Sequence, residues 1–266
     1  MKLGFLGCGK MSGALVRGIL AGGVCSASEI RASDVVKAAA EALGRETGAR
    51  IEGSNQAVVA ESDVVVLGVK PQDALAAVSG VRSGLGGKLL VSIAAGLSLA
   101  RLEEAAGGGV RVIRVMPNTP ALVHQGASAY ALGNAATEAD AATVERVFGA
   151  VGSVDRVSES LLDAVTGLSG SGPAYVYLMV EALADGGVLM GLPRALALRL
   201  AAQTVAGAAH MVLDTGDHPA VLRDAVTSPG GTTIAGVEAM EKAGTRAGLM
   251  AAVRAATERS RELGRA

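Results

Sequence analysis

The sequence predicts an α/β fold, with a doubly wound, mostly parallel sheet in its N-terminal part and an all-α domain in its C-terminal part. Short apolar runs rich in Val and Leu recur through residues 1–158, and they are too short for helices. From Ser158 onward no such run appears, and Ala, Leu and Gly recur at helical spacing instead. We therefore predict two domains, residues 1–158 and residues 159–266.

The first predicted element is a strand over Lys2–Leu6 that runs into a glycine-rich turn, after which apolar residues follow helical spacing. In such a turn Gly7 allows a tight bend, Gly9 lets a pyrophosphate approach the backbone, and Ser12 is a small residue in place of a third glycine. This order predicts a Rossmann-type dinucleotide-binding unit, with a glycine-rich turn that binds no ligand as the alternative. The predicted cofactor contacts of the turn are Gly7, Cys8, Gly9, Lys10, Met11 and Ser12.

A second strand, over Glu29–Ala32, ends in Ser33 and Asp34, near the position that reads the cofactor ribose. Asp34 would accept hydrogen bonds from a free 2′-hydroxyl and repel a 2′-phosphate, which favours NADH. If Asp34 points away and Ser33, Asn55 and Arg31 line the site, NADPH fits as well. The residues alone leave both cofactors open.

Three further buried strands are predicted to end at the ligand crevice, because the carboxyl ends of parallel strands face it. They are Asp63–Val69, Leu89–Ile93 and Val110–Val115. The residues that follow them give the predicted cofactor contacts Val69, Lys70, Pro71, Ala95, Gly96 and Asn118. An exposed lysine at a strand end is the alternative for Lys70. Strands over Ala127–Leu132 and Val151–Val157 are expected to close the sheet around a helix over Glu138–Phe148.

The all-α part contains a stretch with a Pro-Gly-Gly bend. Pro229 ends one helix, and a new one begins at Thr232 and Thr233, since Ile234, Val237 and Met240 recur at helical spacing. Free N–H groups and the positive end of the helix dipole attract an anion at such a helix start. A small carboxylate fits there, and a simple turn with a threonine cap is the alternative.

The stretch from Pro219 to Glu241 resembles the signature of the pyrroline-5-carboxylate reductase family, and the N-terminal half resembles the same family. The residues that carry the resemblance are Pro219, Leu222, Val226, Thr227, Ser228, Gly230, Gly231, Thr233, Gly236, Val237, Met240 and Glu241. It implies reduction of the small molecule 1-pyrroline-5-carboxylate to L-proline, with NADPH favoured and NADH kept open. It also implies a helix-swapped homodimer that assembles into a larger ring.

The resemblance further implies roles for individual residues. Backbone N–H groups and the Ser228 hydroxyl would hold the substrate carboxylate, while the Thr233 hydroxyl would bond the ring nitrogen, with water as an alternative proton donor. The predicted catalytic residues are thus Thr233 and Ser228, and the predicted substrate contacts are Ser228, Gly230, Gly231, Thr232, Thr233 and Thr166.

The glycine-rich segment Asp163–Pro173 distinguishes a cyclic imine reductase from hydroxyacid dehydrogenases with a similar two-domain organisation. Gly167, Gly170 and Gly172 fit the glycine run of those enzymes, but Val176 occupies the place of their catalytic lysine. An alcohol-oxidising enzyme would lack its base, whereas a cyclic imine acceptor needs none. Another imine or keto reductase, an inactive nucleotide-sensing relative and a deazaflavin-dependent oxidoreductase stay open as alternatives.

The composition of the chain excludes several classes of binding partner. The net charge of −1, without a basic block, argues against nucleic acid or an anionic membrane surface, and no metal site is expected from two distant cysteines and three scattered histidines. No apolar run reaches the roughly 20 residues of a membrane span, so we expect a cytoplasmic enzyme. Long helices are predicted over Ala195–Leu213 and Gly244–Leu263, the last with a charged, solvated face. The Ala- and Gly-rich faces over 182–191 exceed what one small helical layer can bury, which indicates a subunit interface.

Overall fold

The structure is a computed structural model that describes residues 1–265, without the side chain of Arg265. Its sheet has the order β3-β2-β1-β4-β5-β6-β7-β8, and neighbouring strands run parallel except for the antiparallel pair β6 and β7. The strands are β1 Leu3–Leu6, β2 Ile30–Ser33, β3 Arg50–Ile51, β4 Val64–Leu67, β5 Leu89–Ser92, β6 Arg111–Met116, β7 Gly126–Leu132 and β8 Gly152–Arg156.

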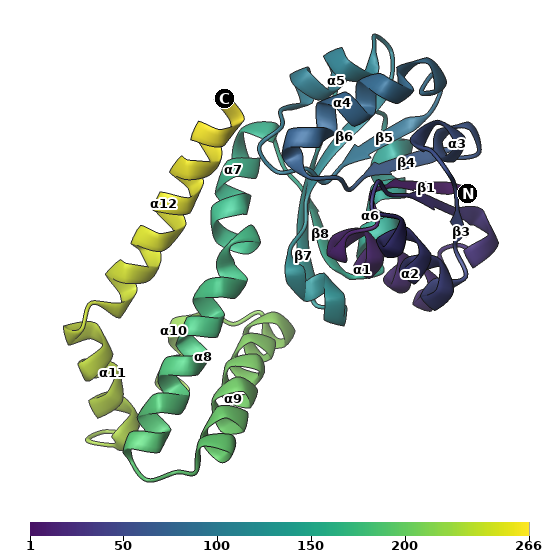
Figure 1. The fold of residues 1–266 in the computed structure, drawn as a ribbon. Coiled ribbons are helices and arrows are strands. Elements are labelled where there is room, and N and C mark those ends of the chain that lie inside the picture. Colours follow the sequence, from purple (N-terminus) through teal and green to yellow (C-terminus); the bar gives the residue numbers. More distant parts are fainter. Residues whose placement is uncertain (266) are drawn as a thin grey trace. The chain divides into compact units, whose positions relative to one another are not determined.

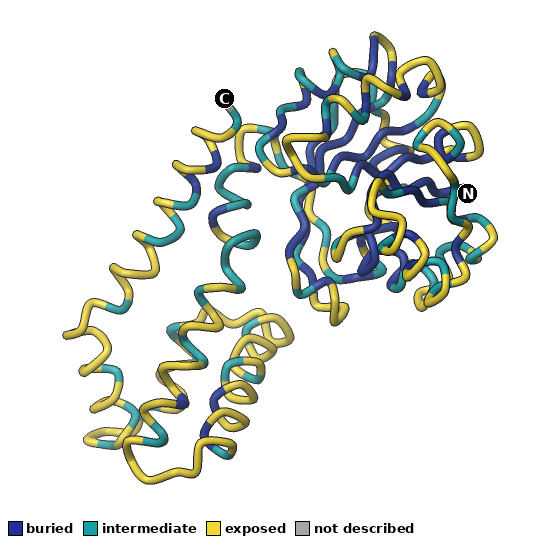
Figure 2. Tube along the Cα trace, in the orientation of Figure 1, coloured by how far each residue is buried: buried dark blue, intermediate teal, exposed yellow. Residues whose placement is uncertain are grey.

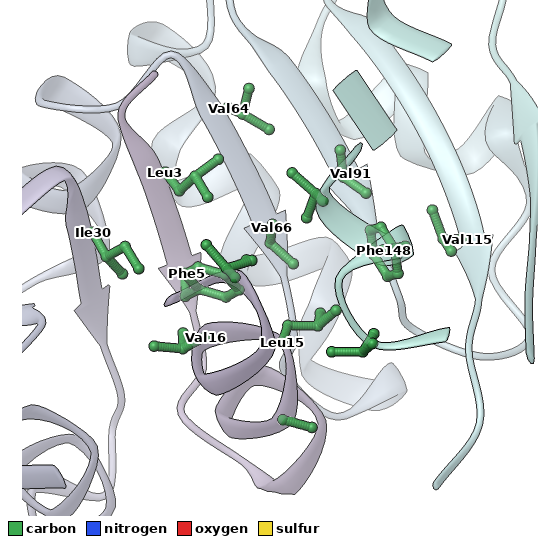
Figure 3. Packing of buried hydrophobic residues seen from close by; sticks show 14 of the residues in the cluster. Leu3, Phe5, Leu15, Val16, Ile30, Val64, Val66, Val91, Val115 and Phe148 are labelled. Carbon is green, nitrogen blue, oxygen red and sulfur yellow. The ribbon is translucent and has the colours of Figure 1, made fainter. Parts of the chain in front are cut away.

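Helices cover both faces of this sheet (Figure 1). They are α1 Lys10–Ala21, α2 Lys37–Thr47, α3 Asn55–Ala60, α4 Pro71–Val81, α5 Leu99–Ala106, α6 Glu138–Gly149 and α7 Leu162–Val165. Alternate residues of β4 explain the two layers: Val64 and Val66 pack with α1, α2 and α6, while Val65 and Leu67 pack with α3, α4 and α5 (Figure 3 shows the first cluster). A strand that is buried on both faces must be apolar throughout, as the sequence pattern indicated.

The predicted fold class is confirmed, and every strand predicted from the sequence is present within a few residues of its expected bounds. The sequence interpretation missed β3, which has only two residues and therefore no readable period. The short β2 and β3 form one edge of the sheet, and β8, half-exposed along much of its length, forms the other.

Contacts divide the chain into two compact units. The first holds Met1–Ser171 together with the described residues from Ala255 onward, and the second holds Gly172–Arg254. The helices of the second unit are α8 Gly172–Leu189, α9 Arg194–Thr215, α10 Pro219–Ala225, α11 Thr232–Lys242 and the first part of α12 Thr245–Arg265. After β8 the described residues form no further strand, as predicted for an all-α C-terminal part.

The division by contacts differs from the predicted boundary at residues 158 and 159, which rests on the change from strands to helices. Leu162 is fully buried in the core layer that also holds α4 and α5. The Glu159 carboxylate accepts hydrogen bonds from the Leu99 backbone N–H at 2.6 Å and from Arg114 at 3.3 Å. Residues 159–171 therefore pack with the sheet although they belong to the helical part of the sequence.

The second unit has little core of its own. Its buried cluster consists of Ala184, Ala197 and Ala201, with Val180 and Val188 packed against it. Figure 2 shows how much of α8, α9, α10 and α11 is exposed. Large apolar side chains stand on these exposed surfaces, among them Tyr177, Leu178, Leu183, Leu189, Met190, Leu198, Leu200, Met211 and Leu213.

One helix in the described part of the chain, α9, is long and apolar enough to cross a membrane by length and composition alone, with 11% of its apolar window buried. The sequence interpretation did not anticipate this, because it looked for uninterrupted apolar runs. Arg194 and Arg199 interrupt the N-terminal end of the helix, while the following residues are rich in alanine. Length and composition are weak grounds for a membrane span, since helices of soluble proteins meet the same criterion.

Candidate active site

The glycine-rich turn between β1 and α1 contains one glycine that the fold requires and one that it does not. Gly7 has φ of +98°, and a Cβ on it would lie 2.8 Å from the backbone carbonyl of Gly68. Gly9 has φ of −70°, and a Cβ on it would meet nothing within 4 Å. Open space beside the backbone at the start of a twelve-residue helix is what a dinucleotide pyrophosphate requires.

Asp34 holds this turn in place from the end of β2. Its two carboxylate oxygens accept hydrogen bonds from the backbone N–H groups of Cys8 and Val36, each at 2.7 Å. Burial, assisted by the charge of Asp34, raises the pKa of the Cys8 thiol to about 12. The cysteine is therefore a neutral, buried packing residue.

Ser12 is the third residue of α1 and is almost fully buried. A Cβ on Gly68 would collide with its hydroxyl, so these two small residues allow the helix to approach β4 closely. The Ser12 hydroxyl is among the few buried polar atoms that have no hydrogen-bond partner in the described structure. Ser12 is therefore a small residue that serves the packing of α1 against the end of β4.

A cavity of about 610 Å³ lies along the carboxyl ends of β1, β2 and β4. Six predicted cofactor contacts line it: Gly7, Gly9, Asp34, Asn55, Val69 and Lys70. An adjoining cavity of about 250 Å³ contains Ser33, whose hydroxyl donates to the Asn55 side-chain oxygen at 2.7 Å. Cys8, Lys10, Met11 and Ser12 are not among the lining residues of either cavity, although they belong to the same turn and helix.

A second group of predicted residues meets around another cavity of the first unit, of about 700 Å³. Pro71, Ala95, Gly96 and Thr166 line it, and Gly96 has φ of +76°. Sequence reasoning missed Arg101, Arg259 and Ser260 in its wall. The last two lie near the end of α12, and no local pattern indicates that this end returns to the sheet.

Asn118 lies inside the loop after β6, where both groups of its side-chain amide have protein partners. Its oxygen accepts from the Ala127 backbone N–H at 2.9 Å, and its nitrogen donates to the Ser169 carbonyl at 3.1 Å. This amide therefore ties the loop to β7 and to the π-helical turn Thr166–Gly170. The predicted contact of Asn118 with the nicotinamide or the substrate stays a prediction, and its bonds describe a positioning role.

One glycine of the segment after α7 lies against the end of β6. A Cβ on Gly170 would lie 2.6 Å from the terminal methyl of Met116, so a larger residue there would require this flexible side chain to move. Thr166 donates its hydroxyl to the Leu162 carbonyl at 2.8 Å and still faces the 700 Å³ cavity, where its oxygen can accept a bond.

The bend between α10 and α11 lies in the second unit and is exposed. Gly230 has φ of +66°, whereas Gly231 has φ of −79°, and a Cβ on Gly231 would collide with the Ser228 hydroxyl in its present position. The Gly231 N–H donates to the Ser228 carbonyl at 3.0 Å, so it is used in the turn. Helix α11 then starts at Thr232, as expected, and no side chain caps its first N–H groups.

Two family descriptions match the chain. Residues 159–263 match pyrroline-5-carboxylate reductase dimerisation, and residues 2–96 match NADP oxidoreductase, coenzyme F420-dependent. The pyrroline-5-carboxylate reductase of Arabidopsis thaliana is 53% identical over 263 residues, which cover 98% of this chain and 95% of the relative. That of Methanosarcina acetivorans is 49% identical, with 99% and 98% covered.

The chain belongs to the pyrroline-5-carboxylate reductase family. A solved pyrroline carboxylate reductase of Plasmodium falciparum with NADP bound superposes with a TM-score of 0.90 at 35% identity, covering 99% of this chain and 98% of that one. The match to the coenzyme F420-dependent oxidoreductase description is limited to residues 2–96 of the chain. The dimerisation match over residues 159–263 indicates a homo-oligomer.

Proposed function

We propose that this reductase-family chain reduces 1-pyrroline-5-carboxylate to L-proline with NADPH or NADH, as the last step of proline biosynthesis. In the balanced reaction the ring C=N bond gains a hydride at carbon and a proton at nitrogen, while the reduced nicotinamide is oxidised to NAD(P)⁺. The likeness to pyrroline-5-carboxylate reductases over nearly the full chain carries the proposal.

The glycine-rich turn supports binding of the dinucleotide. Open space beside Gly9, the positive φ of Gly7 and the close packing of α1 at the small Ser12 fit a pyrophosphate at the start of α1. When bound, the nicotinamide supplies the hydride. The residues Pro71, Ala95 and Gly96 would form the wall beside the nicotinamide, because they lie at the carboxyl ends of β4 and β5 and line one cavity.

The start of α11 supports binding of the substrate carboxylate. Its first N–H groups, from Thr232 onward, lack a side-chain cap, and the helix dipole favours an anion there. The Ser228 hydroxyl would add a donor, and the Thr233 hydroxyl would bond the ring nitrogen and orient the imine. A protonated imine is already a strong electrophile. These residues therefore need only to align the imine carbon with the hydride of the nicotinamide in a water-poor site.

The dimerisation match also supports a proposal on assembly. We propose a homodimer formed through the apolar surfaces of α8 and α9, assembled further into a ring, in the cytoplasm. Leu178 and Leu198 are half or more exposed on the two helices, and a second copy of the chain would bury them. The molar mass in solution, measured by sedimentation equilibrium, gives the number of copies.

The function is tested by following oxidation of NADPH and of NADH by the purified full chain with 1-pyrroline-5-carboxylate and by identifying proline as the product. We expect Thr233→Ala to lower kcat/KM by about 10²-fold or more, the scale of a positioned hydrogen-bond donor. Thr245→Ala is the matched control, because Thr245 also opens a helix of the second unit but is given no role in the site.

Two outcomes would contradict the assignment. Absence of turnover with both cofactors, in a chain that still binds them, would favour an inactive nucleotide-sensing relative. Faster turnover of another cyclic imine or of a keto acid would favour a different reductase on the same fold. Turnover of Thr233→Ala within a few-fold of the unchanged chain would remove Thr233 from the mechanism while leaving the reaction in place.

A further inference from the structure

The cofactor ribose site carries an acidic residue that the fold holds in a fixed position. Asp34 lines both the 610 Å³ cavity and the adjoining 250 Å³ cavity. Its carboxylate accepts from the N–H of Cys8 on the pyrophosphate turn and from the N–H of Val36 immediately before α2. Two backbone bonds at 2.7 Å from different elements fix the negative charge at the end of β2.

The positive charges that a 2′-phosphate would require are directed elsewhere. Arg31, on the same strand, is only 12% exposed in its side chain and pairs with Glu52 at 3.5 Å and Glu61 at 3.6 Å. It does not line either cavity, so the arrangement in which Arg31 would favour NADPH is not the one observed. Lys37 opens α2 on the surface and is also absent from both walls.

The charged residues of the two cavity walls sum to a negative balance. The smaller cavity has Asp34 alone, and the larger adds Asp73 and Lys70, both at the end of β4 and the start of α4. The start of α2 already has one carboxylate against its backbone, because Asp34 accepts the Val36 N–H there. A group of charge about −2, such as a 2′-phosphate, would thus meet a fixed like charge.

We infer that Asp34 determines cofactor specificity in this chain and that the ribose site selects NADH over NADPH. The carboxylate retains lone pairs for a ribose hydroxyl while it accepts the two backbone N–H groups. The inference deepens the proposed function and rests on it for the identity of the cofactor. It is independent of the resemblance, which favours NADPH.

The test compares dissociation constants for NADH and NADPH, measured by titration of the full chain with the fluorescence of the reduced nicotinamide. We expect NADPH to bind at least about tenfold more weakly than NADH, since like charges placed together cost more than the free energy of one decade. Asp34→Ser should reduce that ratio by about tenfold or more, and the same change should appear in the kcat/KM ratio.

Val35→Arg is a second variant that leaves the Asp34 bonds intact. Val35 lines both cavities and is 99% exposed, so an arginine there has room and should strengthen NADPH binding. Asp73→Ser is the matched control, because it removes one carboxylate from the wall of the larger cavity away from β2. It should change the NADPH to NADH ratio clearly less than Asp34→Ser does.

The outcomes separate the inference from the proposed function. NADPH binding as tight as NADH in the unchanged chain, or a ratio that Asp34→Ser leaves in place, would overturn the role of Asp34 even with full reductase activity. If Asp34→Ser and Asp73→Ser changed the NADPH to NADH ratio equally, the preference would arise from the overall charge of the cavity. That result would also overturn the role of Asp34. Absence of turnover with a retained preference for NADH would refute the reaction alone, and failure to bind either dinucleotide would overturn both.

Discussion

Alanine substitutions at Gly7 and Gly9 should affect different properties although only one residue separates the two glycines. Gly7→Ala should lower the free energy of unfolding, whereas Gly9→Ala should weaken cofactor binding. In Gly7→Ala the backbone keeps a φ near +98°, which costs an L-residue roughly 1–2 kcal/mol. The new Cβ also lies 2.8 Å from the Gly68 carbonyl carbon and oxygen, and such overpacking adds roughly 1–3 kcal/mol. The free energy of unfolding should therefore fall by about 2–5 kcal/mol, which lowers Tm by roughly 4–20 °C in a chain of this size.

Gly9→Ala should leave the free energy of unfolding within about 0.5 kcal/mol of the unchanged chain. Gly9 has an extended conformation that alanine adopts without strain, and its Cβ would point into open space. That space lies in the wall of the 610 Å³ cavity, so the methyl group should obstruct the pyrophosphate and raise the Kd for reduced dinucleotide by about tenfold or more.

Differential scanning calorimetry without cofactor measures the first effect, and the increase in Tm with added NADH or NADPH measures the second. Gly7→Ala should melt early, whereas Gly9→Ala should melt normally and show a smaller increase with cofactor. Equal melting of the two variants without cofactor would refute the distinction between a glycine that the fold needs and one that a ligand needs. An unchanged cofactor response in Gly9→Ala would remove the turn from the binding site.

Two further predictions concern the surroundings of this site. Asn118→Ala should lower the free energy of unfolding by about 1–3 kcal/mol, because it leaves the Ala127 N–H and the Ser169 carbonyl without their partner; a calorimetric Tm equal to that of the unchanged chain would contradict this. Cys8 should react slowly with iodoacetamide, because a pKa raised from 9.0 to about 12 lowers its thiolate fraction about 10³-fold below that of the unfolded chain at the same pH. Rapid labelling of Cys8 in the folded protein near pH 8, detected by mass spectrometry, would contradict its burial. The stability that the neutral thiol contributes is complete below pH 9 and is lost as the pH rises toward 12.

The sheet could be predicted from the sequence because its central strands are buried on both faces. Runs such as Val64–Leu67 must be apolar at every position, and such short runs have few other interpretations. The direction of β7 could not be predicted, since a parallel and an antiparallel strand show the same apolar run. Strand β3 escaped notice because Arg50 and Ile51 owe their conformation to pairing with β2 rather than to a pattern of their own.

The candidate site was predictable where function depends on the local backbone and not where it depends on distant packing. Gly7, Gly9 and Lys70 were expected from the order of strand, turn and helix, and all three line one cavity. The hydrogen bonds of Asn118 to Ala127 and Ser169 join segments up to 51 residues apart, so the residues next to Asn118 do not predict them. The same limit applies to the end of α12, which reaches the wall beside Gly96.

The small interior of the second unit has a consequence for how the enzyme holds together. A helical layer whose buried cluster contains only alanines, with two valines beside it, removes too little apolar surface from water to offset the entropy of ordering four helices. The homo-oligomer that the dimerisation match indicates would supply the missing free energy through contact with another copy of the chain. Folding of these helices and association are then one equilibrium, and the midpoint of thermal unfolding should rise with protein concentration as in obligate dimers.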